Sequence, residues 1–169
     1  MPSDLGASVD RVRAALAAHG HPDSIISVPE TARTAEGAAE AIGCDVAQIA
    51  KSIVFRTDGE TAPRPVLVIT SGANRVDPKL VEAALGVKLR PADAAFVREA
   101  TGFAIGGVAP VGHLTQPLTL VDEDLLKLDP IWAAAGSPSL VFHTTAADLV
   151  RLTSARPARV RQAGAVRST

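Results

Sequence analysis

Short apolar runs alternate with turn-forming segments along the chain, and this pattern predicts most of its strands. Runs rich in Val, Ile and Leu that are bounded by Gly, Pro, Asn or Asp are typical of buried strands. We expect strands at residues 24–28, 53–55, 65–70, 87–90, 118–121, 131–135 and 139–143. The second and third are expected to pair antiparallel, because a turn at residues 58–60 separates them.

The segments between these strands carry helix signals. Ser, Thr or Asp stands where most of these helices can begin, and Gly follows several of them. We expect helices at residues 8–19, 34–43, 77–85, 92–100 and 145–152, and a helical turn at 45–50. Strands and helices mix without strict alternation, which predicts an α+β fold with a mixed sheet. One domain is expected over residues 1–155, followed by a basic tail at 156–169.

The most unusual stretch is residues 101–113, which holds four glycines, one proline and one histidine among small apolar residues. Its first part, residues 103–105, is expected to be a short buried strand. Gly106 and Gly107 then allow backbone conformations closed to other residues, and Pro110 stiffens the exit. The pattern fits equally a tight turn between core strands and a loop that presents backbone N–H groups to a ligand.

Composition narrows the classes of function. The 169 residues contain no Tyr, one Trp and one Cys. Base stacking on an aromatic platform is therefore disfavoured, and an intramolecular disulfide or a multi-cysteine metal site is excluded. No apolar run approaches the ~20 residues of a membrane span, and residues 1–10 lack the features of a signal peptide. We expect a soluble cytoplasmic protein without a membrane partner.

Charge is distributed unevenly along the chain. Residues 151–169 contain five arginines and no acidic residue, whereas residues 1–150 contain 12 basic and 18 acidic residues. A basic tail on an acidic body is consistent with a phosphate-binding arm or with a solvated terminus, and the spacing of the arginines slightly favours the second.

Few side chains offer chemistry, and no common nucleophile, phosphate-loop or metal motif is present. Lys51 lies among Ile49, Ala50 and Ile53, where it either extends its ammonium group to solvent or meets an anion. Position alone favours the first. Cys44 is expected to pack, and the acidic run at residues 122–124 is expected to be a solvated helix start. His19 and His21 are expected to be solvated at a helix end.

Three segments carry a family signature when taken together. They are AKSIVF at residues 50–55, SGANRVD at 71–77, and ATG through GGVAPVGH at 100–113. In this order they resemble the YbaK/ProX/EbsC family of aminoacyl-tRNA deacylases, which is related to the editing domain of bacterial prolyl-tRNA synthetase. The resemblance covers roughly residues 24–152.

The resemblance implies a single domain built around a twisted, barrel-like mixed sheet with surrounding helices and an acyl pocket at one end. It implies hydrolysis of the ester that joins a wrong small amino acid, such as Cys or Ala, to tRNA(Pro). No cofactor, metal or protein nucleophile is implied. By correspondence with the family lysine and loop, the predicted catalytic residues are Lys51, Gly106, Gly107, Val108 and Pro110.

Further contacts are predicted on the same basis. Substrate binding is expected at Phe55, Thr101, Phe103, Ala109 and His113, and RNA binding at Arg75 and Arg98. The expected partners are the acceptor end of aminoacyl-tRNA and prolyl-tRNA synthetase, with no DNA. Two other hypotheses remain at this point, namely a catalytically silent tRNA- or nucleotide-binding module on the same fold and an unrelated hydrolase that uses the histidines.

Overall fold

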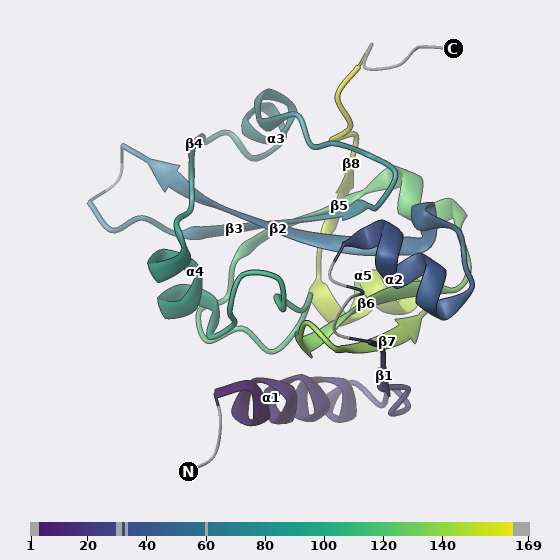
Figure 1. The fold of residues 1–169 in the computed structure, drawn as a ribbon. Coiled ribbons are helices and arrows are strands. Elements are labelled where there is room, and N and C mark those ends of the chain that lie inside the picture. Colours follow the sequence, from purple (N-terminus) through teal and green to yellow (C-terminus); the bar gives the residue numbers. More distant parts are fainter. Residues whose placement is uncertain (1–3, 30–31, 33, 60, 164–169) are drawn as a thin grey trace.

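One mixed sheet organises the chain in this computed structural model, which describes residues 4–29, 32, 34–59 and 61–163 (Figure 1). Among these residues, eight strands are ordered β1-β7-β6-β2-β3-β5-β8, and β4 pairs with β2. Their bounds are β1 (Ile26–Ser27), β2 (Ile49–Asp58), β3 (Pro65–Ser71), β4 (Lys88–Pro91), β5 (Leu118–Asp122), β6 (Ile131–Ser137), β7 (Leu140–Thr144) and β8 (Arg156–Ala158). The prediction of one α+β domain with a mixed sheet is confirmed.

The long strand β2 joins the two halves of the sheet. Its first residues pair in parallel with β6, its length pairs antiparallel with β3 as predicted, and its end pairs antiparallel with β4. Strand β3 is buried on both faces, which explains its continuous apolar sequence. Leu67 and Ile69 belong to the main core, whereas Val66 and Val68 pack in a second cluster.

Five α-helices surround the sheet within the described residues: α1 (Asp4–Ala18), α2 (Ala35–Ile42), α3 (Pro78–Leu85), α4 (Ala94–Thr101) and α5 (Ala146–Thr153). Two short 3-10 turns, η1 (Val46–Gln48) and η2 (Glu123–Lys127), precede β2 and follow β5. The expected caps Thr34, Asp77 and Thr145 each accept a backbone N–H bond. Helices α1 and α3 lie on opposite sides of the sheet (Figure 1). No described helix has the length and apolar character needed to span a membrane.

Two local predictions are wrong. The first helix starts before Ser8, which instead lies inside α1 and donates its hydroxyl to the backbone oxygen of Gly102 at 3.1 Å. Residues 103–105 form no strand but begin the loop from α4 to β5. Phe103 is fully buried as expected, yet the side chain of Ile105 is 60% exposed, because the chain turns back between Ala104 and Gly107.

The packed domain continues beyond residue 155, where the basic tail was predicted to begin. Strand β8 pairs in parallel with β5, and Val160 is fully buried in the second cluster. The backbone N–H of Asp77 also donates to the oxygen of Val160 at 2.7 Å. Residues 156–162 are thus part of the fold rather than a solvated terminus, and the rest of the predicted tail, from residue 164, lies outside the described residues.

Candidate active site

Lys51 is the third residue of β2, and this strand begins directly after the turn η1. A reciprocal capping box between Asp45 and Gln48 closes that turn and starts the strand at Ile49. The half-buried Lys51 side chain donates from Nζ to the backbone oxygen of Asn74 at 2.9 Å. The lysine is therefore held by a specific acceptor, which argues against simple extension to solvent.

An apolar cavity of about 360 Å³ opens beside Lys51. Its walls come from α2, β2, β6, β7 and the α4–β5 loop, and small side chains dominate them. The alanines are Ala32, Ala35, Ala38, Ala50, Ala133 and Ala134, and the larger lining residues include Ile49, Ile53, Trp132, Leu140 and Val141. Gly106 and Val108 also line the cavity. The structure thus brings Lys51 and the glycine loop, which are distant in sequence, to one cavity.

The loop is a tight turn at this wall. The N–H of Gly107 donates to the oxygen of Ala104 at 3.0 Å, and Gly106 has a φ of 95°, which side-chain-bearing residues rarely adopt. A Cβ on Gly107 would lie 3.2 Å from Pro138 and Ser137, so the loop packs closely on the β6–β7 turn. Of the three amides of Gly106, Gly107 and Val108, that of Gly107 is engaged in this turn. The amides of Gly106 and Val108 have no acceptor among the described residues.

Arg11 of α1 contacts both ends of the loop, and no sequence pattern had pointed to it. Its guanidinium donates to the backbone oxygens of Gly102 at 2.8 Å and Gly112 at 3.1 Å. It also lies 5.1 Å from the centre of the Phe103 ring, within range of a cation–π contact. The loop is therefore fixed from behind by one side chain of an N-terminal helix.

His113 braces the same loop from within. Its Nε2 lies 2.7 Å from the oxygen of Ala109, and its ring meets Phe103 edge-on at 5.2 Å. Burial lowers the pKa of His113 below its ordinary value, outweighing the bond to Ala109, and Arg11 adds to the lowering. The neutral ring then donates to Ala109 and leaves Nδ1 buried without a partner in the described residues. His113 also lines a separate cavity of about 160 Å³.

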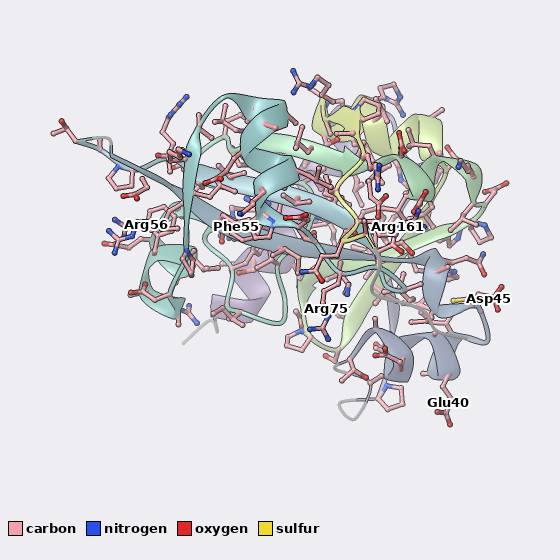
Figure 2. The ribbon with its side chains drawn as sticks, turned by 90° about the horizontal axis from the view of Figure 1, so that it is seen from above. Glu40, Asp45, Phe55, Arg56, Arg75 and Arg161 are labelled. Atoms are coloured by element: carbon pink, nitrogen blue, oxygen red, sulfur yellow. The ribbon has the colours of Figure 1, made fainter. Side chains whose placement is uncertain are left out.

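Most of the other predicted contact residues also lie away from the apolar cavity. Phe103 and Ala109 are fully buried in the main core, and Thr101 bonds the backbone of its own helix end. Phe55 lies on β2 opposite Pro91 of β4, and Figure 2 shows it at a distance from Arg75. Pro110 is buried beside the smaller cavity of His113, and Arg98 is exposed on α4.

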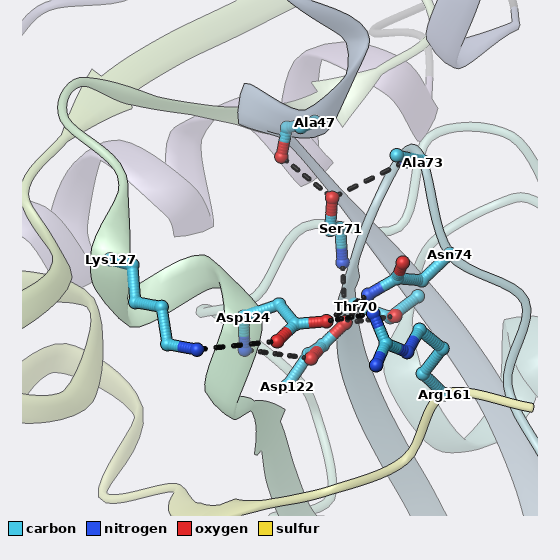
Figure 3. A network of polar contacts seen from close by, with 9 residues as sticks. All are labelled: Ala47, Thr70, Ser71, Ala73, Asn74, Asp122, Asp124, Lys127 and Arg161. Atoms are coloured by element: carbon cyan, nitrogen blue, oxygen red, sulfur yellow. Dashed lines mark hydrogen bonds and ion pairs between the residues drawn. The ribbon is translucent and has the colours of Figure 1, made fainter. Parts of the chain in front are cut away.

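Figure 3 shows a polar network around Asp122 and Asn74, and the backbone oxygen of Asn74 is the acceptor for Lys51. Asp122 is 1% exposed and accepts from the Thr70 hydroxyl at 2.7 Å, the Ser71 amide at 3.1 Å and the Asn74 side chain at 2.8 Å. Asn74 also donates to Asp124 at 2.9 Å. These bonds position the backbone oxygen of Asn74, which accepts the hydrogen bond from Lys51. The acidic run was expected to be solvated, and that is wrong for Asp122, because β5 inserts next to β3.

Lys51 also borders a second, polar cleft of about 480 Å³. This polar cleft is lined by Glu36, Lys51, Gly72, Ala73, Asn74, Arg75, Arg161 and Gln162. A Cβ on Gly72 would lie 2.5 Å from the Val46 oxygen, so the turn that carries Asn74 and Arg75 requires glycine there. Lys51 is thus shared between an apolar cavity and a polar cleft.

Other chemistry finds little support. No group of three or more His, Cys, Asp or Glu side chains that could hold a metal ion occurs within the described ranges. Burial, with a smaller effect of Asp45, raises the pKa of the Cys44 thiol, which disfavours the reactive thiolate. His21 is buried and contacts the Thr144 hydroxyl at 3.0 Å rather than standing solvated.

Comparisons with known proteins show similarity in sequence and in fold. The sequence model of a family described as the aminoacyl-tRNA editing domain matches residues 29–152. The uncharacterised protein YwhH of Bacillus subtilis is 30% identical over 142 residues, covering 84% of this chain and 88% of YwhH. A crystal structure described as "a putative trans-editing enzyme for prolyl tRNA synthetase" is 41% identical, covers 92% of this chain and 97% of its own, and superposes with a TM-score of 0.84. The hypothetical protein APE2540, 24% identical over 90% of this chain and 99% of its own, shares the fold with a TM-score of 0.81.

Proposed function

Because the chain belongs to the aminoacyl-tRNA editing domain family, we propose that it hydrolyses the ester that links a wrongly attached amino acid to tRNA. The observation that carries this proposal is the position of Lys51, which borders both the apolar cavity and the polar cleft. An aminoacyl ester has the same two parts, a small organic side chain and a charged nucleotide. The junction at Lys51 is where the ester bond between them would lie.

The groups around Lys51 supply a route for hydrolysis of the ester. Attack on the ester carbonyl places negative charge on its oxygen, and preorganised donors at that point lower the barrier. The amides of Gly106 and Val108 and the Lys51 ammonium group are such donors in this proposal. Water attacks the carbonyl carbon, assisted by the free neighbouring hydroxyl of the same ribose. The bond from that carbon to the esterified ribose oxygen breaks, this oxygen takes a proton from the water and leaves as a hydroxyl, and the amino acid is released as its carboxylic acid. No protein nucleophile is required.

We further propose that the substrate is tRNA(Pro) carrying a small amino acid such as Ala or Cys. The alanine-rich wall of the cavity supports a small acyl side chain. The relation of one similar structure to prolyl-tRNA synthetase supports tRNA(Pro), with that synthetase as a partner that delivers the substrate. Arg75 and Arg98, both exposed, are proposed to contact the RNA.

The proposal is tested by incubating the purified protein with tRNA(Pro) charged with Ala, Cys, Ser, Thr or 2-aminobutyrate. Pro-tRNA(Pro) and Ala-tRNA(Ala) serve as controls for the amino acid and for the tRNA. We expect hydrolysis of at least one mischarged species and its persistence in EDTA. If none is hydrolysed while the RNA still binds, the fold serves as a silent tRNA-binding module instead.

A further inference from the structure

The polar cleft has one wall that the family match does not include. Arg161 and Gln162 lie beyond residue 152, where the match ends, yet both line the cleft beside Lys51 and Arg75. Figure 2 labels Arg75 and Arg161, which come from the β3–α3 turn and from the segment after β8. The end of the described chain therefore completes a site whose other side lies within the family domain.

Backbone contacts fix this C-terminal wall. Arg161 pairs with Val76 in an isolated antiparallel bridge, and the amide of Gln162 donates to the oxygen of Arg75 at 2.8 Å. The Gln162 side chain adds a bond to the oxygen of Val76 at 3.3 Å. Because these bonds join the segment directly to the turn that carries Arg75, the two arginines are held at one site.

The cleft is locally positive on an otherwise acidic body. Three cations line it, Lys51, Arg75 and Arg161, against the single carboxylate of Glu36. Arg161 makes one ion pair, with Nη1 at 3.4 Å from Asp124, and its side chain remains 54% exposed. Asp122 and Asp124 stand behind the cleft, where Asn74 already occupies both carboxylates. A planar guanidinium with donors left over is suited to phosphate oxygens.

We propose that Arg161, together with Arg75, binds the phosphodiester on the 5′ side of the terminal nucleotide of the substrate RNA. This inference rests on the proposed function and adds the place of the phosphate to it. The ester and that phosphate are attached to the same ribose, so a phosphate site must adjoin the ester site. The polar cleft adjoins it through Lys51. The C-terminal segment thereby orients the substrate rather than acting as a diffuse basic tail.

The test compares Arg161→Gln with the control Arg159→Gln. The control removes the same charge two residues earlier, and the Arg159 side chain is exposed and does not line the cleft. Two substrates are used, Ala-tRNA(Pro) and 2′(3′)-O-alanyl-adenosine, which lacks the phosphate. We expect Arg161→Gln to lower kcat/KM about tenfold on the tRNA, the usual worth of a hydrogen bond to a charged group. Hydrolysis of alanyl-adenosine should not change, and Arg159→Gln should leave both rates near wild type.

Binding of an uncharged RNA minihelix ending in CCA tests the phosphate site without catalysis. Arg161→Gln should weaken binding and reduce the slope of log Kd against log salt by about 0.7, the value for one single-strand phosphate contact. Arg161→Lys should recover part of the loss. Equal RNA affinities for the Arg161→Gln and Arg159→Gln variants overturn the inference, as does an equal loss on both ester substrates. A wild-type protein that binds the minihelix in this way but hydrolyses none of the five mischarged tRNA(Pro) species would contradict the proposed function alone.

Discussion

The two cavities that meet at Lys51 are built in different ways. The apolar cavity is walled by alanines, backbone and a few larger side chains, none of which depends on a particular polar partner. The polar cleft is backed by a connected set of bonds that runs from Lys51 through Asn74 to Asp122 and Asp124. A change in the first wall alters shape, whereas a change in the second leaves a buried group without its partner. The apolar side is therefore suited to varying specificity and the polar side to fixing the reaction geometry.

Lys51→Ala should show the largest effect on the polar side. Among the described residues, Lys51 alone lines both cavities. The substitution removes this side chain and a donor near the ester, so deacylation should fall about 10²- to 10³-fold. Lys88→Ala, an exposed lysine on β4, is the matched control. Single-turnover hydrolysis measures the activity, and thermal unfolding shows separately whether the variant is folded. A Lys51→Ala protein that is folded and fully active would remove Lys51 from the mechanism.

Asp122→Asn should destabilise the fold and slow the reaction together. The carboxylate accepts at both oxygens, three bonds at Oδ2 and the Asp124 amide at Oδ1, whereas the asparagine side chain accepts at one oxygen only, so the free energy of unfolding should fall by roughly 1–3 kcal/mol. One of the two bonds that hold the Asn74 side chain is then weakened, and the backbone oxygen that accepts from Lys51 is less firmly positioned, which should lower kcat more than it raises KM. Urea unfolding and steady-state kinetics check both effects, with Glu123→Gln as a neighbouring exposed control. Unchanged kinetics would show that the network serves stability alone.

Trp132→Leu should affect the apolar side through selectivity. Trp132 lines the cavity and pairs in register with Ile49 at its floor, so a smaller residue adds room there. One methylene in such a pocket is worth about 1–3 kcal/mol. The ratio of kcat/KM for 2-aminobutyryl- over alanyl-tRNA(Pro) should therefore rise about tenfold or more. A constant ratio would place the acyl side chain elsewhere.

Arg11→Lys should loosen the loop without changing charge. Lysine cannot bond Gly102 and Gly112 together as the guanidinium does, so the loop amides should lose alignment and kcat should fall up to about tenfold. Arg13→Lys, on the same helix and ion-paired with Asp23 at the surface, is the control. Equal kinetics for the two variants would contradict a role for Arg11 in positioning the loop.

The smallest expected effect is a pH dependence from His113. Its pKa is lowered in the folded state by burial, so the unfolded chain binds the proton more readily. The stability associated with the neutral ring is complete above the ordinary value of 6.5 and declines as pH falls below it. The free energy of unfolding should therefore drop more between about pH 7.5 and pH 5.5 for wild type than for His113→Gln. Parallel pH profiles for the two proteins would contradict this.

Local signals predicted the elements well where one residue type dictates the local geometry. The caps Thr34, Asp77 and Thr145 each begin the expected helix, and β3 was predicted from its β-branched run to within one residue. The strand expected at residues 103–105 failed because a small apolar run has the same composition in a strand and in a buried loop. Only the turn bond between Ala104 and Gly107 separates the two.

The candidate site divides in the same way. Lys51 and the glycine loop were found from their residues and a family resemblance, and the structure places both at one cavity. Arg11 and Trp132 gave no usable signal. Asn74, Asp122 and Arg161 lie in segments that the sequence singled out, but their roles come from partners distant in sequence. Phe55, Phe103 and Ala109 were predicted near the substrate, but an apolar residue in the core and one in a pocket look alike in sequence.

The sequence by itself determined most of the strands and caps, the mixed α+β class and the family, because each depends on local preference or on motifs contiguous in the chain. The tertiary structure decided which residues share a cavity and which acids are buried. It also decided that residues 156–162 belong to the fold, since β8 pairs with β5 and Val160 enters the core. Burial and hydrogen bonding between distant segments depend on the packing of the whole chain, and no local pattern encodes them.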